Sequence, residues 1–264
     1  MNIYIMVDAE GISGIFDREQ VLSSLDSRRY NEGRELMVRD INACVEACKE
    51  AGVEKVYVRD CHGSGANVIW SQLSSLADYY IMGYTGQDRF PGLDECYGVI
   101  LLGYHSMAGT PGGILEHTMN SASVQNYWIN GKKAGEIAID AGIAGDRGKP
   151  VIMVSGDDKA CREAEALIPG VVTAQVKKGI TWKGGMLLPP GKAYALIKEK
   201  TKEAISKLPS IKPLVYEKPI KLRVELVERG ILPLQYSKPY MKIIDGRTYE
   251  VEGSSMEEAL FRLY

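Results

Sequence analysis

The stretch Asn2-Ile-Tyr-Ile-Met-Val-Asp-Ala-Glu-Gly11 decides how the rest of the chain is interpreted. Its apolar first half, ending at Val7, predicts a short β-strand. Residues two apart in an extended chain point the same way, so Asp8 and Glu10 face one side where this strand ends. The glycine that follows lets the chain turn sharply. Taken alone, the two acids also fit a solvated turn that caps a helix.

Two later strands are predicted to end in the same way. Residues 54–60 form the second predicted strand, with His62 just beyond it, and residues 98–103 form another, with His105 just beyond it. Asp60 shares a face with His62, an arrangement common around metal-bound imidazoles. The carboxyl ends of parallel strands meet at one edge of an open sheet, where ligands bind. His62 by itself also fits an ordinary loop histidine.

The chain has only three histidines, and core packing would scatter them more widely along it. The third, His117, ends the glycine-rich loop 109–117 that follows the strand before His105. Glu136 follows an Asn-Gly turn signal and opens a predicted helix over residues 136–144. By itself Glu136 is an ordinary first-turn acid, favoured there by the helix dipole.

Carboxylates and imidazoles without a thiolate pair suit Zn²⁺, and also Mn²⁺ or Co²⁺. The candidate ligands are Asp8, Glu10, His62, His105 and Glu136. This set is large enough for two metals that share a bridging carboxylate, a pair that activates water and polarises a carbonyl. The five cysteines contain no C-x-x-C pair, so they offer no comparable metal site.

Short β-rich runs alternate with helical stretches through most of the chain, which predicts an α/β fold with a mostly parallel sheet and helices on both faces. Helices are expected over residues 28–51, 71–77, 136–144, 157–166, 190–208 and 254–263. We expect a metal-binding catalytic α/β domain over residues 1–170. A smaller α+β lobe is expected over residues 171–264, with oligomerisation as one role for it.

Composition excludes several classes of protein. The net charge is −2 and no basic run carries interleaved aromatics, so nucleic acid is not an expected partner. No apolar segment approaches the ~18 residues of a membrane span. The N-terminus has no basic region before its apolar run, unlike a signal peptide. We therefore expect a cytoplasmic protein with no membrane partner.

Several motifs together resemble the bacterial binuclear zinc D-aminopeptidases, the family of dipeptide-transport operon proteins. The resemblance covers nearly the whole chain. The motifs are Tyr4-x-x-Val7-Asp8-x-Glu10-Gly11-Ile-Ser-Gly14, Asp60-x-His62, Leu102-Gly-Tyr-His105, Thr110-Pro-Gly, His117, Tyr127-x-Ile-Asn130 and Gly135-Glu136.

The resemblance implies two Zn²⁺ ions per chain. Asp8 would bridge them, with Glu10 and His105 on one metal and His62 and Glu136 on the other. It also implies a catalytic role for the residue at position 117 and a homodecamer that encloses its active sites.

One position departs from the family pattern. The family has a serine two residues before the first aspartate, where this chain has Met6. In a strand Met6 faces the same way as Asp8, so a hydrogen bond to the site is lost. The change bears on substrate preference rather than on metal binding.

These observations predict a zinc-dependent aminopeptidase that hydrolyses short peptides, with N-terminal D-amino acids as one substrate class. A metal-activated water would attack the peptide carbonyl while the imidazole of His117 transfers protons. Two alternatives stay open: a metal-dependent amidohydrolase of non-peptide amides, and a non-catalytic, metal-stabilised oligomeric binding protein. The sequence leaves stereospecificity, peptide length and the native metal undetermined.

Overall fold

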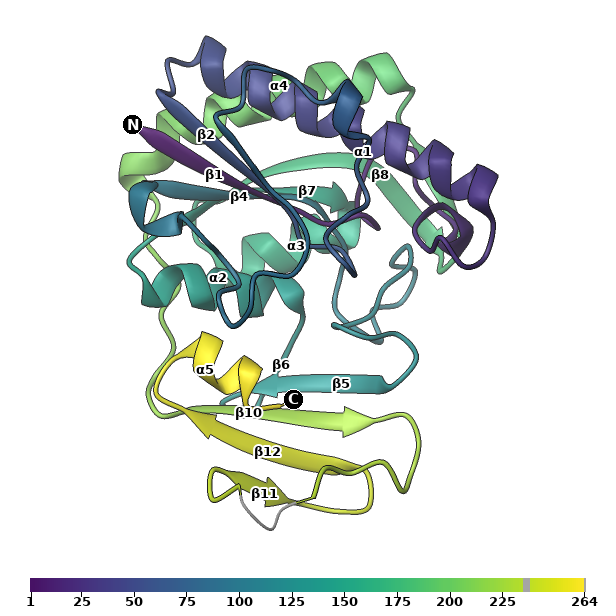
Figure 1. Cartoon of the computed structure of the whole chain (residues 1–264), viewed down its shortest axis with the longest axis vertical. Coiled ribbons are helices and arrows are strands. Elements are labelled where there is room, and N and C mark those ends of the chain that lie inside the picture. The colour runs from purple at the N-terminus through teal and green to yellow at the C-terminus, as the bar shows by residue number, and fades with distance from the viewer. Residues whose placement is uncertain (235–237, 264) are drawn as a thin grey trace.

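The computed structural model describes residues 1–234 and 238–263. It has two lobes (Figure 1): in the larger one, helices cover a seven-stranded sheet, and the smaller one is built around a five-stranded sheet.

The larger sheet runs in the order β3-β2-β1-β4-β7-β8-β9. Its strands are β1 (Asn2–Val7), β2 (Lys55–Asp60), β3 (Tyr79–Ile81), β4 (Gly98–Tyr104), β7 (Val151–Asp157), β8 (Val172–Thr181) and β9 (Gly184–Leu187). Neighbouring strands are parallel except β8 and β9. Val7 pairs with Asp60 of β2 and with Leu102 of β4, so the carboxyl ends of these three strands lie together.

Helices lie on both faces of this sheet (Figure 1). α1 (Ser27–Glu50) and α4 (Pro190–Lys207) pack against each other over one face, and α2 (Glu136–Asp146) and α3 (Asp158–Leu167) cover the other. Every residue of β4 and β7 is consequently buried, which explains the apolar character of both strands. The predicted α/β fold is confirmed.

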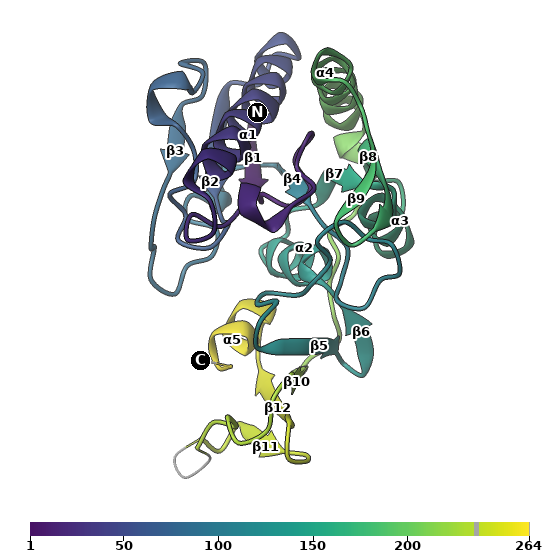
Figure 2. The same ribbon diagram turned by 90° about the vertical axis from the view of Figure 1, so that its right-hand side faces the viewer.

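The second sheet is antiparallel throughout and has the order β11-β12-β10-β5-β6. Its strands are β5 (Val124–Ile129), β6 (Lys132–Ala134), β10 (Ile220–Leu226), β11 (Met241–Ile243) and β12 (Thr248–Gly253). Alternate residues of β10 are buried, as expected for a strand with one packed face. The final helix α5 (Met256–Phe261) contacts β10, β12 and α2, and Figure 2 shows it between the second sheet and α2.

Short 3₁₀ helices complete the structure: η1 (Arg18–Gln20), η2 (Trp70–Gln72), η3 (Leu93–Glu95) and η4 (Leu208–Ser210). Among the helices of residues 1–234 and 238–263, none combines the length and the apolar character needed to cross a bilayer.

The expected boundary at residue 170 does not separate the two sheets. β8, β9 and α4 lie beyond it and still belong to the larger sheet and its helical cover, whereas β5 and β6 lie before it and belong to the second sheet. The β5–β6 hairpin pairs with β10, almost a hundred positions later in the chain, and local sequence pattern carries no signal for such pairing.

The helix expected over residues 71–77 is wrong. Only η2 forms there, because polar side chains capture the backbone that a helix would need. The Asn42 side chain accepts a hydrogen bond from the Ser74 N–H at 2.8 Å, and the Ser74 hydroxyl accepts one from the Leu76 N–H at 3.3 Å.

Gly33 lies where α1 meets η1 and allows a test of this packing. A Cβ at Gly33 would lie 1.9 Å from the Gln20 carbonyl oxygen, whereas a Cβ at Gly191 of α4 would meet nothing within 4 Å. We predict that Gly33→Ala lowers the free energy of unfolding by about 2 kcal/mol or more. Gly191→Ala should leave it unchanged or raise it by up to about 1 kcal/mol through helix propensity. Urea unfolding measures both, and equal stability of the two variants would contradict the packing.

Candidate metal centre

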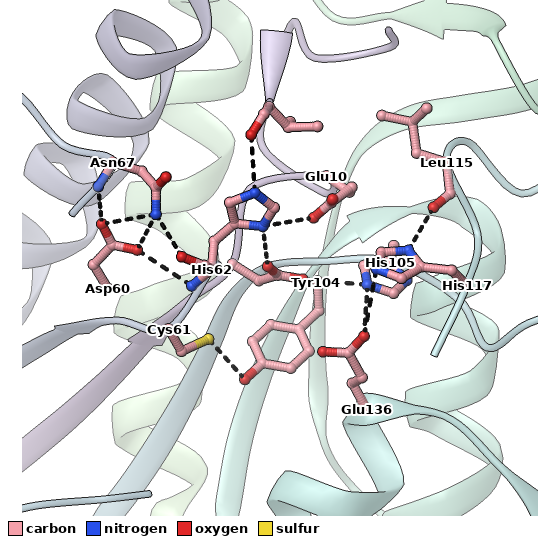
Figure 3. A network of polar contacts seen from close by, with 12 residues as sticks. Glu10, Asp60, Cys61, His62, Asn67, Tyr104, His105, Leu115, His117 and Glu136 are labelled. Carbon is pink, nitrogen blue, oxygen red and sulfur yellow. Dashed lines mark hydrogen bonds and ion pairs between the residues drawn. The ribbon is translucent and has the colours of Figure 1, made fainter. Parts of the chain in front are cut away.

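All six residues singled out from the sequence lie together at the carboxyl edge of the larger sheet. Asp8 and Glu10 follow β1, and the three histidines come after β2 and β4. Glu136 is the first residue of α2, which begins directly below this edge. Figure 3 shows Glu10 turned toward His62, and Glu136 turned toward the rings of His105 and His117.

Direct contacts divide the cluster into two halves that meet at Asp8. Nδ1 of His62 lies 3.2 Å from Asp8 Oδ1 and 3.2 Å from Glu10 Oε2. Nε2 of His105 lies 3.3 Å from Asp8 Oδ2 and 3.2 Å from Glu136 Oε1. The resemblance instead places Glu10 and His105 on one metal, and that grouping stays a prediction. One ligand atom each of Asp8, Glu10 and His105 also lie within 4.8 Å of one another.

Backbone carbonyl groups orient all three imidazole rings, and Figure 3 shows the contact between Leu115 and His117. His62 Nε2 lies 3.0 Å from the Val21 oxygen, and His105 Nδ1 lies 3.0 Å from the Ser106 oxygen. His117 Nδ1 lies 2.9 Å from the oxygen of Leu115. A carbonyl oxygen can only accept, so each of these nitrogens carries the hydrogen. In a neutral ring, the other nitrogen then directs its lone pair at carboxylate oxygens.

That arrangement is unfavourable unless a positive charge lies between the lone pairs. Asp8 Oδ2, Glu10 Oε2 and His105 Nε2 are buried and, among residues 1–234 and 238–263, make no hydrogen bond; their contacts are the imidazole–carboxylate pairs at 3.2 to 3.3 Å. Buried carboxylate oxygens and imidazole nitrogens without hydrogen bonds are the ligands that a divalent transition metal takes, and a carbonyl acceptor behind a ligating imidazole is the usual second contact. The residues therefore fit a zinc site.

Burial and charge oppose each other in the pKa values of this cluster. Burial lowers the pKa of His62, but the Glu10 and Asp8 carboxylates outweigh it and raise that pKa well above its ordinary value. His105 behaves in the same way, with Glu136 as the main cause of the rise. Burial raises the pKa of Asp8, and Glu10 adds to the rise. The cluster thus attracts positive charge.

Asp60 does not orient the imidazole ring of His62 as the sequence suggested. Its carboxylate accepts hydrogen bonds from the backbone N–H of His62 at 3.2 Å and of Asn67 at 2.6 Å. The Asn67 side-chain amide also donates to the His62 carbonyl at 2.6 Å. Asp60 therefore fixes the loop that carries His62, while the ring is held by Val21.

The loop that carries His117 is held in an uncommon conformation. Leu115 and Met119, two residues on either side of His117, have φ angles of 55° and 64°, in the left-handed region that side chains other than glycine rarely adopt. Leu115 supplies the carbonyl behind the His117 ring, and the Met119 N–H donates to Glu136 Oε1 at 2.7 Å. His117 stacks on His105, with ring centroids 4.0 Å apart.

Sequence reasoning missed Lys177 of β8. Its ammonium group is buried and donates to the carbonyl oxygens of Glu10 at 2.6 Å, Ile12 at 2.9 Å and Ile15 at 2.6 Å. Burial lowers the pKa of Lys177 to about 8, so the group is still largely protonated at neutral pH. Nothing in the sequence near position 177 distinguishes this lysine from its exposed neighbour Lys178.

A second polar network, centred on Asp140, supports the metal cluster. Asp140 of α2 is fully buried between Arg89, whose Nη2 donates to it at 2.9 Å, and Tyr104, whose hydroxyl donates to it at 2.6 Å. Tyr104 directly precedes His105. The network thus connects α2, which begins with Glu136, to the end of β4.

The cluster opens into a cavity of about 430 Å³. Asp8, Glu10, His62, His117 and Glu136 line its floor, and Arg18 and Trp182 line other parts of its wall. A cavity of this size accommodates a small organic molecule or a short peptide.

Comparisons with known proteins point to one family. The family model for D-aminopeptidases matches residues 1–263. A D-aminopeptidase of Bacillus subtilis strain 168 is 36% identical over 262 residues, which are 98% of this chain and 94% of that protein. A solved structure is also similar: the zinc-dependent D-aminopeptidase DppA of Bacillus subtilis, described as a self-compartmentalizing protease. Its TM-score is 0.92 at 35% identity, over 99% of this chain and 95% of that one.

Lys177→Met tests how far the site depends on the buried ammonium group. We predict a loss of about 2 to 4 kcal/mol in the free energy of unfolding, since three carbonyl acceptors lose a charged donor. Bound metal should also become easier to remove with a chelator, because the loop that ends in Glu10 loosens. Lys178→Met at the exposed neighbouring position is the control. Wild-type stability and wild-type metal retention in Lys177→Met would rule out the supporting role.

Proposed function

The chain belongs to the D-aminopeptidase family of peptidases, and we propose that it is a zinc-dependent aminopeptidase acting on short peptides, D-amino acids at the N-terminus included. One observation carries this proposal. Three imidazoles are each held on one side by a backbone carbonyl and turned on the other toward buried carboxylates. That geometry suits metal ligation.

We propose two zinc ions per chain, with Asp8, Glu10, His62, His105 and Glu136 as their ligands. The shortest contacts favour Asp8 as the bridging carboxylate, with Glu10 and His62 on one side of it and His105 and Glu136 on the other. Bound zinc supplies Lewis-acid activation of water and of the scissile carbonyl group.

His117 is placed to transfer protons during the reaction. Its Nδ1 donates to Leu115, which leaves Nε2 as the atom that accepts a proton or returns one to the leaving amine. Nε2 lies 3.7 Å from Glu136 Oε1, and the residue lines the cavity. The constrained backbone around Leu115 and Met119 keeps the ring in this position when substrate enters.

The substrate proposal combines the family with the shape and charge of the cavity. Carboxylates surround its floor and attract the ammonium group of a free peptide N-terminus, and its volume suits peptides of a few residues. Preference for a D-residue is proposed from the relatives, which are described as D-aminopeptidases.

We further propose a homo-oligomer, with the decamer implied by the family resemblance as its form. A related protein is described as self-compartmentalizing. Several large apolar side chains are exposed in the single chain and would be covered by neighbouring subunits, among them Trp70, Ile180, Met186 and Leu234. A cytoplasmic location stays a prediction from the sequence.

Metal content tests the ligand set. We predict about two equivalents of zinc per wild-type chain and the loss of one equivalent in both His62→Ala and Glu136→Ala, because each removes a ligand from a different half of the cluster. Elemental analysis after dialysis measures this, with Glu54→Ala, an exposed acid, as the control. Two retained equivalents in either variant would exclude that residue as a ligand.

Kinetics tests the role of His117. In His117→Ala we expect kcat for D-Ala-D-Ala to fall roughly 100- to 10,000-fold, the usual contribution of a general acid or base, while both metal equivalents remain bound. Release of alanine from D-Ala-D-Ala and from L-Ala-L-Ala by the wild type gives the stereochemical preference, with the D-peptide expected to react faster. Loss of metal in His117→Ala would instead make His117 a ligand.

A further inference from the structure

A second cavity of about 420 Å³ adjoins the first. The two share Cys61, Gly63, Arg89 and Met119 as lining residues, so they lie side by side. Loops at residues 63–65 and 83–86 form one side of the second cavity, and α5 contributes to another. None of the residues in the metal cluster lines it.

Arg59 of β2 lines this second cavity and carries an unmatched charge. The residue is 9% exposed, and its Nε and Nη1 are buried without a hydrogen-bond partner in the described part of the chain. Its guanidinium also makes no ion pair with any residue in 1–234 or 238–263. Arginine does not deprotonate in proteins, so Arg59 cannot relieve the cost of burial by becoming neutral.

The other charged residues of this cavity already have partners. Asp140 balances Arg89 through two hydrogen bonds, and Arg147 pairs with Asp88 at 2.9 Å. The Asp60 carboxylate accepts hydrogen bonds from the Asn67 side chain and from backbone N–H groups of its own loop. Among the charged residues that line this cavity in the described part of the chain, Arg59 alone has no hydrogen-bond or ion-pair partner, so its guanidinium is the group that would receive an anion.

Four glycines also line this cavity. Gly63, Gly65, Gly83 and Gly86 all have φ angles between 52° and 74°. A Cβ at Gly65 would lie 3.0 Å from the backbone nitrogen of Gly83, so the two loops approach each other only because that side chain is absent. A flat, two-pronged anion such as a carboxylate matches the fork of donors that a guanidinium presents.

We propose that Arg59 binds the C-terminal carboxylate of a peptide whose amino end lies in the metal-lined cavity, which makes the second cavity a specificity subsite for free peptides. This inference rests on the proposed aminopeptidase function. It explains how the protein would restrict itself to short substrates: only a peptide of the right length reaches from the metal cluster to the buried guanidinium.

Kinetics with matched substrates tests the subsite. Peptides of two, three and four D-alanine residues are compared with their C-terminal amides, in wild type, Arg59→Gln, Arg59→Lys and the control Arg223→Gln in the second sheet. For at least one length we expect wild type and control to favour the free carboxylate about tenfold in kcat/KM, mainly through KM. Arg59→Gln should remove that preference, with Arg59→Lys in between. An unchanged ratio in Arg59→Gln at every length overturns the proposal.

Binding without turnover separates this proposal from the catalytic one. Sodium acetate, titrated against sodium chloride at constant ionic strength, should raise the melting temperature of wild type and control but not of Arg59→Gln. Arg59→Gln should melt no lower than wild type without acetate, because it removes an uncompensated charge, and this verifies its fold. Equal acetate shifts in Arg59→Gln and wild type refute the subsite even if the protein hydrolyses peptides. An Arg59-dependent acetate shift alongside unchanged peptide selectivity refutes the assignment to a peptide end.

Discussion

The repulsion between buried carboxylates at the end of β1 is the constraint on which the rest of the site depends. Asp8, Glu10 and Glu136 are each less than a tenth exposed and lie around the same imidazoles. Like charges at this separation, away from water, strongly destabilise one another. The protein can hold them there only if positive charge balances them, which is why the pKa values of His62 and His105 are raised and why a bound metal ion would stabilise the cluster.

The fold positions these carboxylates through backbone contacts as well as through side-chain packing. Gly11 donates its N–H to the Gly103 oxygen at 2.7 Å, and a Cβ at Gly11 would lie 2.0 Å from the Tyr104 oxygen. The turn after β1 is therefore pressed against the end of β4, while Lys177 holds it from β8. Three strands of a parallel sheet thus determine where the first two acids stand, before any ligand binds.

Much of the fold and of the metal cluster was predictable because the sequence patterns that indicate them are local. Strand ends marked by Asp8, His62 and His105 follow from short apolar runs, and the parallel sheet makes those ends meet. The interpretation failed where contacts are distant in sequence. The β5–β6 hairpin joins a sheet completed by residues after position 219, and Lys177 contributes through backbone carbonyls that carry no residue-specific signal. The contacts within the cluster depend on ring orientation, which the backbone oxygens of Val21 and Ser106 impose and which local sequence pattern does not encode.

The family relationship and the geometry of the metal cluster are separate lines of evidence that agree. The comparisons give the chain a family and a reaction, and the cluster supplies the residues that we propose for that reaction. The most direct measurement is diffraction at the zinc absorption edge from crystals of zinc-loaded protein. Two anomalous peaks are predicted on either side of Asp8, one beside Glu10 and His62 and the other beside His105 and Glu136. Absence of any peak in this cluster, or zinc held by other residues, would contradict the central claim.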